Sequence, residues 1–177
     1  MSTNRHVLLL PGSLRTGSSN DVMLRTAAAA APEGVSTTLY AGLGGLPHFN
    51  PDDDSDPLPA PVAALREAIA AADAILVCTP EYAGTLPGSF KNLLDWTVGG
   101  VEISDKPTGW INAANPGRGE GAEATLRMVL DYTGAAVLDE ACVRIAVDRE
   151  AVGPDGLIGD PAVRKQLAKV LTVLTAG

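Results

Sequence analysis

Basic residues are scarce in this chain, and long apolar runs are missing from it. The 177 residues include 13 Lys and Arg against 21 Asp and Glu, which gives a formal net charge of −8. That sign disfavours a nucleic-acid backbone or an anionic membrane as the main partner. No apolar stretch approaches the ~20 residues of a membrane span, and the N-terminal apolar run is too short for a secretory signal. We therefore expect a cytoplasmic protein that binds neither nucleic acid nor membrane.

Cysteine and histidine are also rare, with two of each. Cys78 and Cys142 lie within apolar runs and lack the CxxC spacing, which favours two reduced core residues over a disulfide or a redox pair. Two histidines without other clustered ligands predict no metal site. We interpret His48, the histidine that falls in a long candidate functional loop, as a structural or rim residue.

What the chain does contain is an alternation of strand-like and helix-like segments, within a composition that is 46% apolar. Continuous apolar runs predict buried parallel strands, and helical spacing of apolar residues follows each of them. The expected strands cover residues 6–10, 35–40, 74–79, 108–114 and 142–147. The expected helices cover residues 19–31, 62–72, 87–97, 126–133 and 160–174. Five β-α units without a linker predict one α/β domain, residues 1–177, in which helices cover both faces of a five-stranded parallel sheet.

Sheets of this kind bind ligands beyond the carboxyl ends of their strands, where the strand order reverses. In the order 2-1-3-4-5 the reversal lies between the first and third strands. The loops after residues 10 and 79 should therefore meet, with the loop after residue 114 beside them. We expect the long loop at 41–61 to be functional or mobile, and its acidic run at 52–56 to be a solvated loop face.

The first of these loops, residues 11–20, reads "PGSLRTGSSN" and is rich in hydrogen-bond donors. It precedes a helix whose N-terminal amides favour an anion. A lysine required by the P-loop is missing, and Leu14 replaces the second glycine of the dinucleotide fingerprint. A phosphate of a mononucleotide fits best; a plain turn with a serine cap explains Ser18 or Ser19 but not Arg15. The candidate phosphate ligands are Ser13, Arg15, Ser18, Ser19 and Asn20.

The second loop begins "TPEYAGTLPG", residues 79–88. Pro80 and Gly84 indicate a rigid turn whose backbone groups can bind the edge of a flat heterocycle, and Tyr82 offers an apolar face. We interpret Glu81 as a structural or helix-end partner rather than as a catalytic base. Trp96, farther along, is a packing residue of the core or of a subunit interface.

The third loop, "NAANPGRGEGAE" at residues 112–123, is rich in glycine. Asn115 before a proline, together with Gly117, indicates a turn that lets a planar ring approach the backbone closely. Arg118 is either a phosphate ligand or a solvated arginine, and the sequence leaves both interpretations open.

Taken together, the loops resemble the NAD(P)H-dependent FMN reductase family, which includes quinone, chromate and azo-dye reductases. Its first signature, GS-x-R-x-x-S-x-N, is matched by Gly12, Ser13, Arg15, Ser18 and Asn20. Its second, PEYN-x-x-x-PG-x-x-KN-x-x-DW, is matched by Pro80, Glu81, Tyr82, Pro87, Gly88, Lys91, Asn92, Asp95 and Trp96. The stretch "LPHFNPD" at 46–52 also resembles the family. The resemblance implies a flavodoxin-like three-layer sandwich with strand order 2-1-3-4-5.

The resemblance further implies that FMN is the cofactor. Its phosphate would contact Ser13, Arg15, Ser18 and Asn20, and its ribityl chain and isoalloxazine would lie against Pro80, Glu81, Tyr82 and Gly84. The candidate cofactor-binding set is completed by Ser19, Ala83, Asn115, Gly117 and Arg118. Ala83 departs from the family, which has Asn there, so a side-chain hydrogen bond to the flavin would be lost while backbone contacts remain.

The function expected from this resemblance is NAD(P)H-dependent flavin oxidoreduction. Hydride would pass from NADPH or NADH through FMN to a quinone-like or other small acceptor, and no catalytic acid or base is required. Homodimers or homotetramers would use the helix at 87–96 and the loop at 47–49. The alternative is a flavodoxin-type electron carrier reduced by a partner protein, which the acidic charge favours and Arg15 disfavours. A third possibility is a binding module that keeps the fold without flavin.

Overall fold

The computed structural model describes residues 4–147 and 149–176, and its centre is a five-stranded sheet. The strands run parallel in the order β2-β1-β3-β4-β5, which confirms the expected fold class. Their bounds are β1 Arg5–Pro11, β2 Val35–Leu39, β3 Ala74–Cys78, β4 Pro107–Asn112 and β5 Ala136–Arg144.

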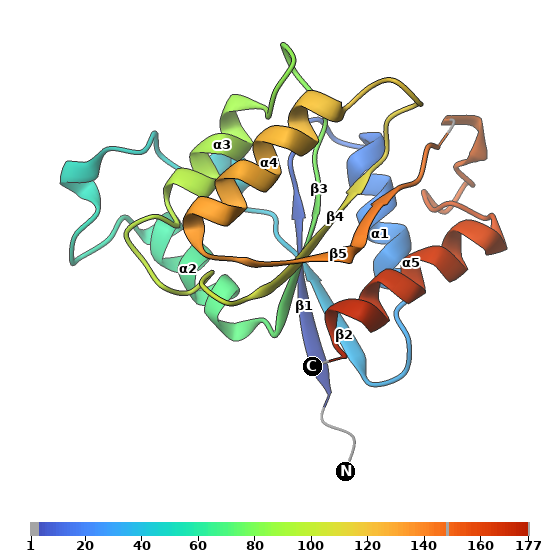
Figure 1. Ribbon diagram of the computed structural model, residues 1–177, viewed down its shortest axis with the longest axis horizontal. Coiled ribbons are helices and arrows are strands. Elements are labelled where there is room, and N and C mark those ends of the chain that lie inside the picture. Colours follow the sequence, from blue (N-terminus) through green and yellow to red (C-terminus); the bar gives the residue numbers. More distant parts are fainter. Residues whose placement is uncertain (1–3, 148, 177) are drawn as a thin grey trace.

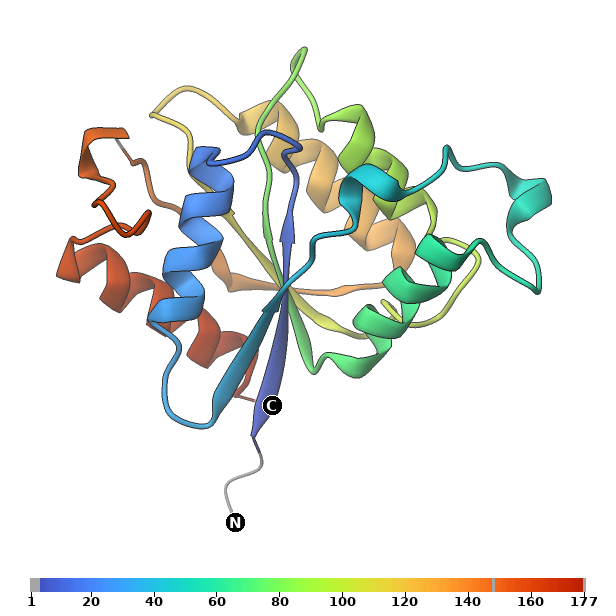
Figure 2. The same cartoon turned by 180° about the vertical axis from the view of Figure 1, so that it is seen from behind.

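Helices cover both faces of the sheet, as Figures 1 and 2 show from opposite sides. Helices α2, α3 and α4 lie on one face, and α1 and α5 pack against each other on the opposite face. Their bounds are α1 Ser19–Ala29, α2 Ala60–Ala71, α3 Gly88–Asp95, α4 Glu120–Thr133 and α5 Pro161–Leu174. Short 3-10 helices lie at η1 Leu43–Gly45, η2 Pro51–Asp53 and η3 Arg149–Ala151.

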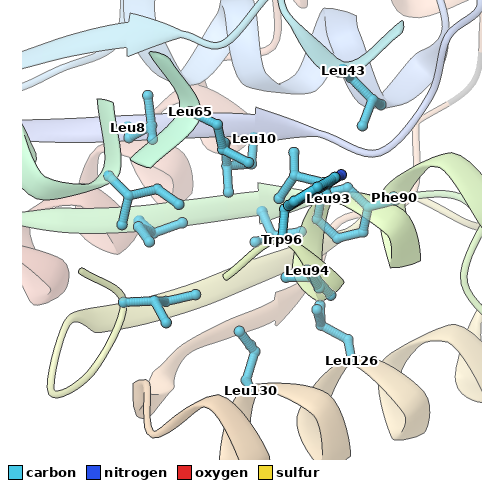
Figure 3. Packing of buried hydrophobic residues seen from close by; sticks show 14 of the residues in the cluster. Leu8, Leu10, Leu43, Leu65, Phe90, Leu93, Leu94, Trp96, Leu126 and Leu130 are labelled. Atoms are coloured by element: carbon cyan, nitrogen blue, oxygen red, sulfur yellow. The ribbon is translucent and has the colours of Figure 1, made fainter. Parts of the chain in front are cut away.

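The inner strands β1 and β3 are buried on both faces, which explains their unbroken apolar sequences. All five residues of β3 are buried, and successive residues of β1 contribute to two separate cores. Figure 3 shows the core under α2, α3 and α4, where Trp96, Phe90 and Leu93 pack against the sheet. Trp96 has no exposed surface, so its interpretation as a core residue is confirmed.

Strand β5 begins at Ala136, six residues before the expected start at residue 142. Asp139 and Glu140 are exposed on this edge strand, and they interrupt the apolar run that predicts the strand. The register also shifts between Thr108 and Trp110 of β4. The first part of this irregular, half-exposed edge strand therefore escapes a pattern search that depends on continuous burial, whereas its end at 142–144 is predicted.

The long loop between β2 and α2 extends away from the body of the molecule (Figure 1, in cyan). Its base is fixed to α3: Asn92 Nδ2 and Trp96 Nε1 each donate to the carbonyl oxygen of Pro47 over 2.8 Å. Phe49 packs edge-to-face on Trp96, with 5.0 Å between the ring centroids. The side chains of Asn92, in α3, and of Trp96, directly after it, thus hold the base of a loop that the sequence predicts to be functional or mobile.

The helix ends follow the local sequence. Asp160, the residue before α5, caps the helix by accepting a hydrogen bond from the amide of Ala162, a position that favours aspartate. Among the described residues no helix has both the length and the apolar character needed to cross a membrane. The two cysteines are free thiols.

Candidate functional site

The loops after β1, β3 and β4 lie at one end of the sheet (Figure 1) and enclose a hollow of about 550 Å³. We call this hollow the central pocket. It sits at the carboxyl ends of the strands, on both sides of the order reversal, where α/β sheets bind ligands. It is lined by Ser13, Arg15, Ser18, Ser19, Asn20, Thr79, Pro80, Glu81, Tyr82, Asn112, Ala113, Ala114, Arg118 and Gly119.

The loop after β1 passes close to the end of β3. A Cβ on Gly12 would lie 2.1 Å from Thr79 Oγ1, so only glycine allows this approach. Ser18 caps α1, with its Oγ accepting from the amide of Asp21 over 3.2 Å. Ser18 is therefore an N-cap, as the interpretation of this loop as a plain turn predicts. That interpretation does not explain Arg15, which is exposed and lines the pocket beside the cap. The loop presents a cation and the start of a helix to the same space.

A buried contact between β3 and α1 supports the floor of the central pocket. Cys78, the last residue of β3, donates from Sγ to Asn20 Oδ1 over 3.3 Å. Burial raises the pKa of the Cys78 thiol far above its usual range. The thiol therefore stays protonated and is a structural partner of the Asn20 amide, whose nitrogen remains a donor at the pocket wall.

The loop after β3 is a tight hairpin. Tyr82 and Thr85 exchange two backbone hydrogen bonds of 2.9 and 3.1 Å, and the two residues between them have positive φ, 51° at Ala83 and 78° at Gly84. Positive φ at both central positions defines a type I′ turn, which favours Asn-Gly. Ala83 thus occupies a left-handed position that ordinarily selects Asn or Gly.

Glu81 joins the loop after β3 to helix α4. Its Oε2 accepts from the amides of Gly121 and Ala122 over 2.8 and 3.2 Å. A Cβ on Gly121 would lie only 2.0 Å from the carbonyl oxygen of Gly84, so the helix approaches the hairpin as closely as backbones allow. Glu81 is the helix-end partner that the sequence suggests, and its carboxylate compensates the N-terminal dipole of α4.

Asn112, at the end of β4, organises the third loop. Its Oδ1 accepts from the amide of Ala114 over 2.9 Å, and its Nδ2 donates to the carbonyl of Arg118 over 3.4 Å. Arg144 donates to the same carbonyl over 2.6 Å. Gly119 has φ 83°, and a Cβ there would strike the Asn112 side chain. The backbone of this loop is therefore held open toward the central pocket.

The structure brings most of the predicted site residues together. All five candidates of the first loop, with Pro80, Glu81, Tyr82 and Arg118, line the central pocket. Ala83, Gly84, Asn115 and Gly117 lie in turns outside that lining. Sequence reasoning missed Thr79, Asn112, Ala113, Ala114 and Gly119. Asn112 directly ends a buried strand, and that position is the signal that would have singled it out.

The central pocket fits a mononucleotide such as FMN. Its volume lies in the range of roughly 300–1,000 Å³ typical of small-molecule sites. Within the described part of the chain the Arg15 guanidinium makes no hydrogen bond or ion pair, so its donors remain for a phosphate. Ala113 and Ala114 line the pocket with small side chains, so a ring edge can approach the backbone there.

A larger hollow, about 760 Å³, lies between α4 and β5 on the outer side of the sheet. Its lining includes three carboxylates, those of Glu123, Asp131 and Asp139, and its arginine, Arg127, is paired with Asp139. Such a lining repels a phosphate. The central pocket is therefore the better fit to a phosphate-bearing ligand despite its smaller volume.

The fold is that of an α/β protein of the flavodoxin-like class, and its central pocket fits a mononucleotide. Comparison with known proteins makes this more specific: residues 5–149 match the model of the NADPH-dependent FMN reductase family. The chain belongs to this family. The family model covers the first and second signatures and the central pocket in full.

Two relatives and one solved structure are similar over nearly the whole chain. An NAD(P)H-dependent FMN reductase from Pseudomonas aeruginosa is 35% identical over 98% of this chain and 95% of its own. A quinone reductase from Escherichia coli is 31% identical over 97% of this chain and 94% of its own. The solved structure is that of the flavoenzyme NAD(P)H:(acceptor) oxidoreductase from Paracoccus denitrificans. It has 30% sequence identity and a TM-score of 0.82, and the match covers 96% of this chain and 94% of that one. The protein is thus an oxidoreductase that uses FMN and NAD(P)H.

Proposed function

We propose that this protein transfers reducing equivalents from NAD(P)H to a small quinone-like acceptor, with FMN held in the central pocket. In the balanced reaction NAD(P)H, a proton and a quinone give NAD(P)⁺ and a hydroquinone. FMN, when bound, supplies the hydride chemistry. The observation that carries the proposal is the central pocket itself, where the Arg15 guanidinium meets the start of α1 at the carboxyl ends of the strands.

The chain's own part in this reaction is binding and orientation. Arg15, the hydroxyls of Ser13 and Ser19 and the Asn20 amide would hold the phosphate, with the N-terminal amides of α1 behind them. Pro80, Glu81 and Tyr82 would lie along the ribityl chain and ring. The turns that contain Ala83, Gly84, Asn115 and Gly117 would border the ring edge. Because Glu81 caps α4, the two walls of the pocket keep a fixed separation.

Among the described residues, no side chain at the central pocket is arranged as a general acid or base. Glu81, the carboxylate in the lining, is committed to two backbone amides. Tyr82 is 54% exposed, so the mouth of the pocket is open to water. The proton for the reduced acceptor would come from that water, and the open mouth would admit flat acceptors of different sizes.

The experiment that tests the proposal is anaerobic reduction of the FMN-loaded protein. NADPH and NADH are added separately while the visible bands of oxidised flavin are recorded, and a benzoquinone follows. We expect one nucleotide to bleach the bands within seconds and the quinone to restore them. Bound FMN that neither nucleotide reduces would contradict the proposal and favour an electron carrier that a partner protein reduces. Failure to retain FMN would favour a module without flavin.

We also propose that residues 1–177 act as one domain and that the protein works in the cytoplasm as a homodimer or homotetramer. The interface with a second copy would lie on the face formed by α3 and the loop at 47–49. Val98 and Val101, just beyond α3, are 65% and 80% exposed there. Such apolar side chains gain from burial against a second copy. Analytical ultracentrifugation should show a dimer or tetramer that Val101→Glu dissociates; a concentration-independent monomer would contradict the assembly.

A further inference from the structure

The loop between β4 and α4 (Figure 1) forms one wall of the central pocket, to which Ala114, Arg118 and Gly119 contribute. The backbone on either side of Arg118 is left-handed, with φ of 79° at Gly117 and 83° at Gly119. Glycine allows many backbone conformations besides the one observed. The shape of this wall therefore depends on the contacts that hold the loop from behind.

The carbonyl oxygen of Arg118 is the point at which the sheet holds this loop. Asn112 Nδ2, at the end of β4, donates to it over 3.4 Å, and Arg144 Nη1, at the end of β5, donates to it over 2.6 Å. A carbonyl oxygen has two lone pairs, so both are engaged and neither is left to repel an anion in the central pocket. The bond from Arg144 is the shorter one and comes from a charged donor, which makes it the stronger of the two.

Arg144 is itself held by Glu123, in the first turn of α4. Arg144 Nη2 donates to Glu123 Oε2 over 2.8 Å, and Trp110 Nε1 donates to Glu123 Oε1 over 3.2 Å. The side chains of Arg144 and Glu123 are 30% and 27% exposed, so water screens their attraction only in part. Both residues lie outside the lining of the central pocket. The planar guanidinium bonds the carboxylate and the loop carbonyl at once in a fixed geometry, which a lysine ammonium cannot reproduce.

The side chain of Arg118 has no such support of its own. It is exposed and lines the central pocket. Over residues 4–147 and 149–176 its guanidinium makes no hydrogen bond or ion pair. The direction of this side chain is therefore set by the backbone from which it starts, and Arg144 fixes that backbone.

We propose that Arg144, held by Glu123, is a positioning residue of the central pocket. It fixes the Arg118 carbonyl and so keeps the Arg118 guanidinium directed at the bound FMN. Arg118 is then a ligand of the cofactor and not a solvated arginine, and Arg144 acts only through it. The inference rests on the proposed function, because it takes FMN as the ligand of the central pocket.

The first test is a double-mutant cycle on FMN affinity, measured by fluorescence titration. Arg118→Gln and Arg144→Gln should each weaken binding by about tenfold, the effect of one charge-assisted contact. The double variant should bind little more weakly than Arg118→Gln alone, because Arg144 acts through Arg118. Arg144→Lys keeps the charge and one contact, so it should lose less affinity than Arg144→Gln.

Arg164→Gln is the matched control for this cycle. Arg164 is also half-buried, and its Nε donates to a backbone carbonyl, that of Ile158, over 2.7 Å. It lies outside the lining of the central pocket. The variant therefore removes a comparable bond and should leave the FMN affinity unchanged.

Hydrogen exchange in the protein without flavin, followed by NMR, gives a second measurement. The amides of Ala114 and Arg118 are hydrogen-bonded within the loop. In Arg144→Gln both should exchange about tenfold faster, because the loop opens locally once its strongest bond is lost. Glu123→Gln, which keeps an acceptor oxygen but no charge, should give a smaller increase. The amide of Gly12, bonded to the end of β3, should keep its rate in both variants.

Several results would overturn the inference. They are additive losses of FMN affinity in the cycle, an Arg118→Gln variant that binds FMN as tightly as the original protein, and unchanged exchange of the loop amides in Arg144→Gln. A failure of the proposed function is distinguishable from these. A protein whose bound FMN neither nucleotide reduces lacks the activity, but the cycle and the exchange rates involve no reduction and still test Arg144. A protein that binds no FMN would overturn both.

Discussion

The carboxylate of Glu81 lies 2.8 Å from the amide nitrogen of Gly121, so a residue of the loop after β3 caps the helix that follows β4. The two walls of the central pocket are joined by this contact and by the close approach of Gly121 to Gly84. If the loop after β3 moved without α4, both contacts would break. The geometry of the central pocket therefore depends on contacts between its own walls and not on a bound ligand.

Glu81→Gln should lower the free energy of unfolding by about 1 kcal/mol, because the amide still accepts a hydrogen bond but no longer opposes the helix dipole with a charge. The affinity for FMN should fall in parallel. Urea unfolding and fluorescence titration with FMN measure the two effects. Glu67→Gln, on the exposed face of α2, is the control and should change neither. An unchanged stability in Glu81→Gln would mean that the charge of the cap is unimportant.

Gly121→Ala should destabilise the protein by about 1–3 kcal/mol, although alanine favours a helix by up to about 1 kcal/mol. The added Cβ would lie 2.0 Å from the carbonyl of Gly84, so the helix or the hairpin must move. Gly88→Ala is the matched control, since none of the described atoms lies within 4 Å of a Cβ at that position. Thermal unfolding of both variants should give opposite shifts in Tm; equal shifts would refute the close contact.

Ala83→Asn should stabilise the protein by about 1 kcal/mol, because asparagine tolerates the left-handed backbone that Ala83 adopts at φ 51°. Ala83→Gly should gain less, since glycine relieves the same strain but makes the unfolded chain more flexible by about 0.4–1 kcal/mol. Ala64→Gly, within α2, is the control and should destabilise. Urea unfolding of the three variants measures these changes in the free energy of unfolding. A loss of stability in Ala83→Asn would show that the turn is not strained.

Arg15→Gln should weaken FMN binding by about 1.5–3 kcal/mol, the contribution of a hydrogen bond to a charged group. Riboflavin has no phosphate, so its weaker binding should not change. Equilibrium dialysis with both flavins makes the comparison, and Arg127→Gln serves as the control. If the variant lost equal affinity for FMN and riboflavin, Arg15 would act on the shape of the loop and not on a phosphate.

The stability of the protein should decline at alkaline pH, in part through Cys78. Burial raises the pKa of this thiol in the folded state, whereas the unfolded thiol loses its proton above about pH 8.5. Above that pH the unfolded state binds fewer protons, so the free energy of unfolding falls as pH rises. In Cys78→Ala the free energy of unfolding should fall less steeply with pH, by up to about 1.4 kcal/mol per pH unit. Urea unfolding between about pH 8 and pH 10 measures the slope, and identical slopes would contradict the burial of the thiol.

Much of the fold could be predicted because its inner strands are buried on both faces. Such strands appear as unbroken apolar runs, and the strand order alone predicts that the first and third loops lie beside the second. The start of β5 could not be predicted, since Asp139 and Glu140 give an edge strand the composition of a loop. Only the structure shows the strained φ of Ala83 and identifies α4 as the helix that Glu81 caps. The position of Asn112 at the end of a buried strand marks it as a candidate, but its hydrogen bonds to Ala114 and Arg118 depend on the fold of the loop after it.

The exposed acids of β5 have one more consequence. An edge strand presents unpaired backbone groups that can accept another strand and start a growing fibril. Asp139, whose side chain is 81% exposed, and its neighbour Glu140 would oppose like charges on any identical strand added in register. The same two residues that hide the start of the strand from sequence analysis thus protect it against misassembly when the protein is concentrated.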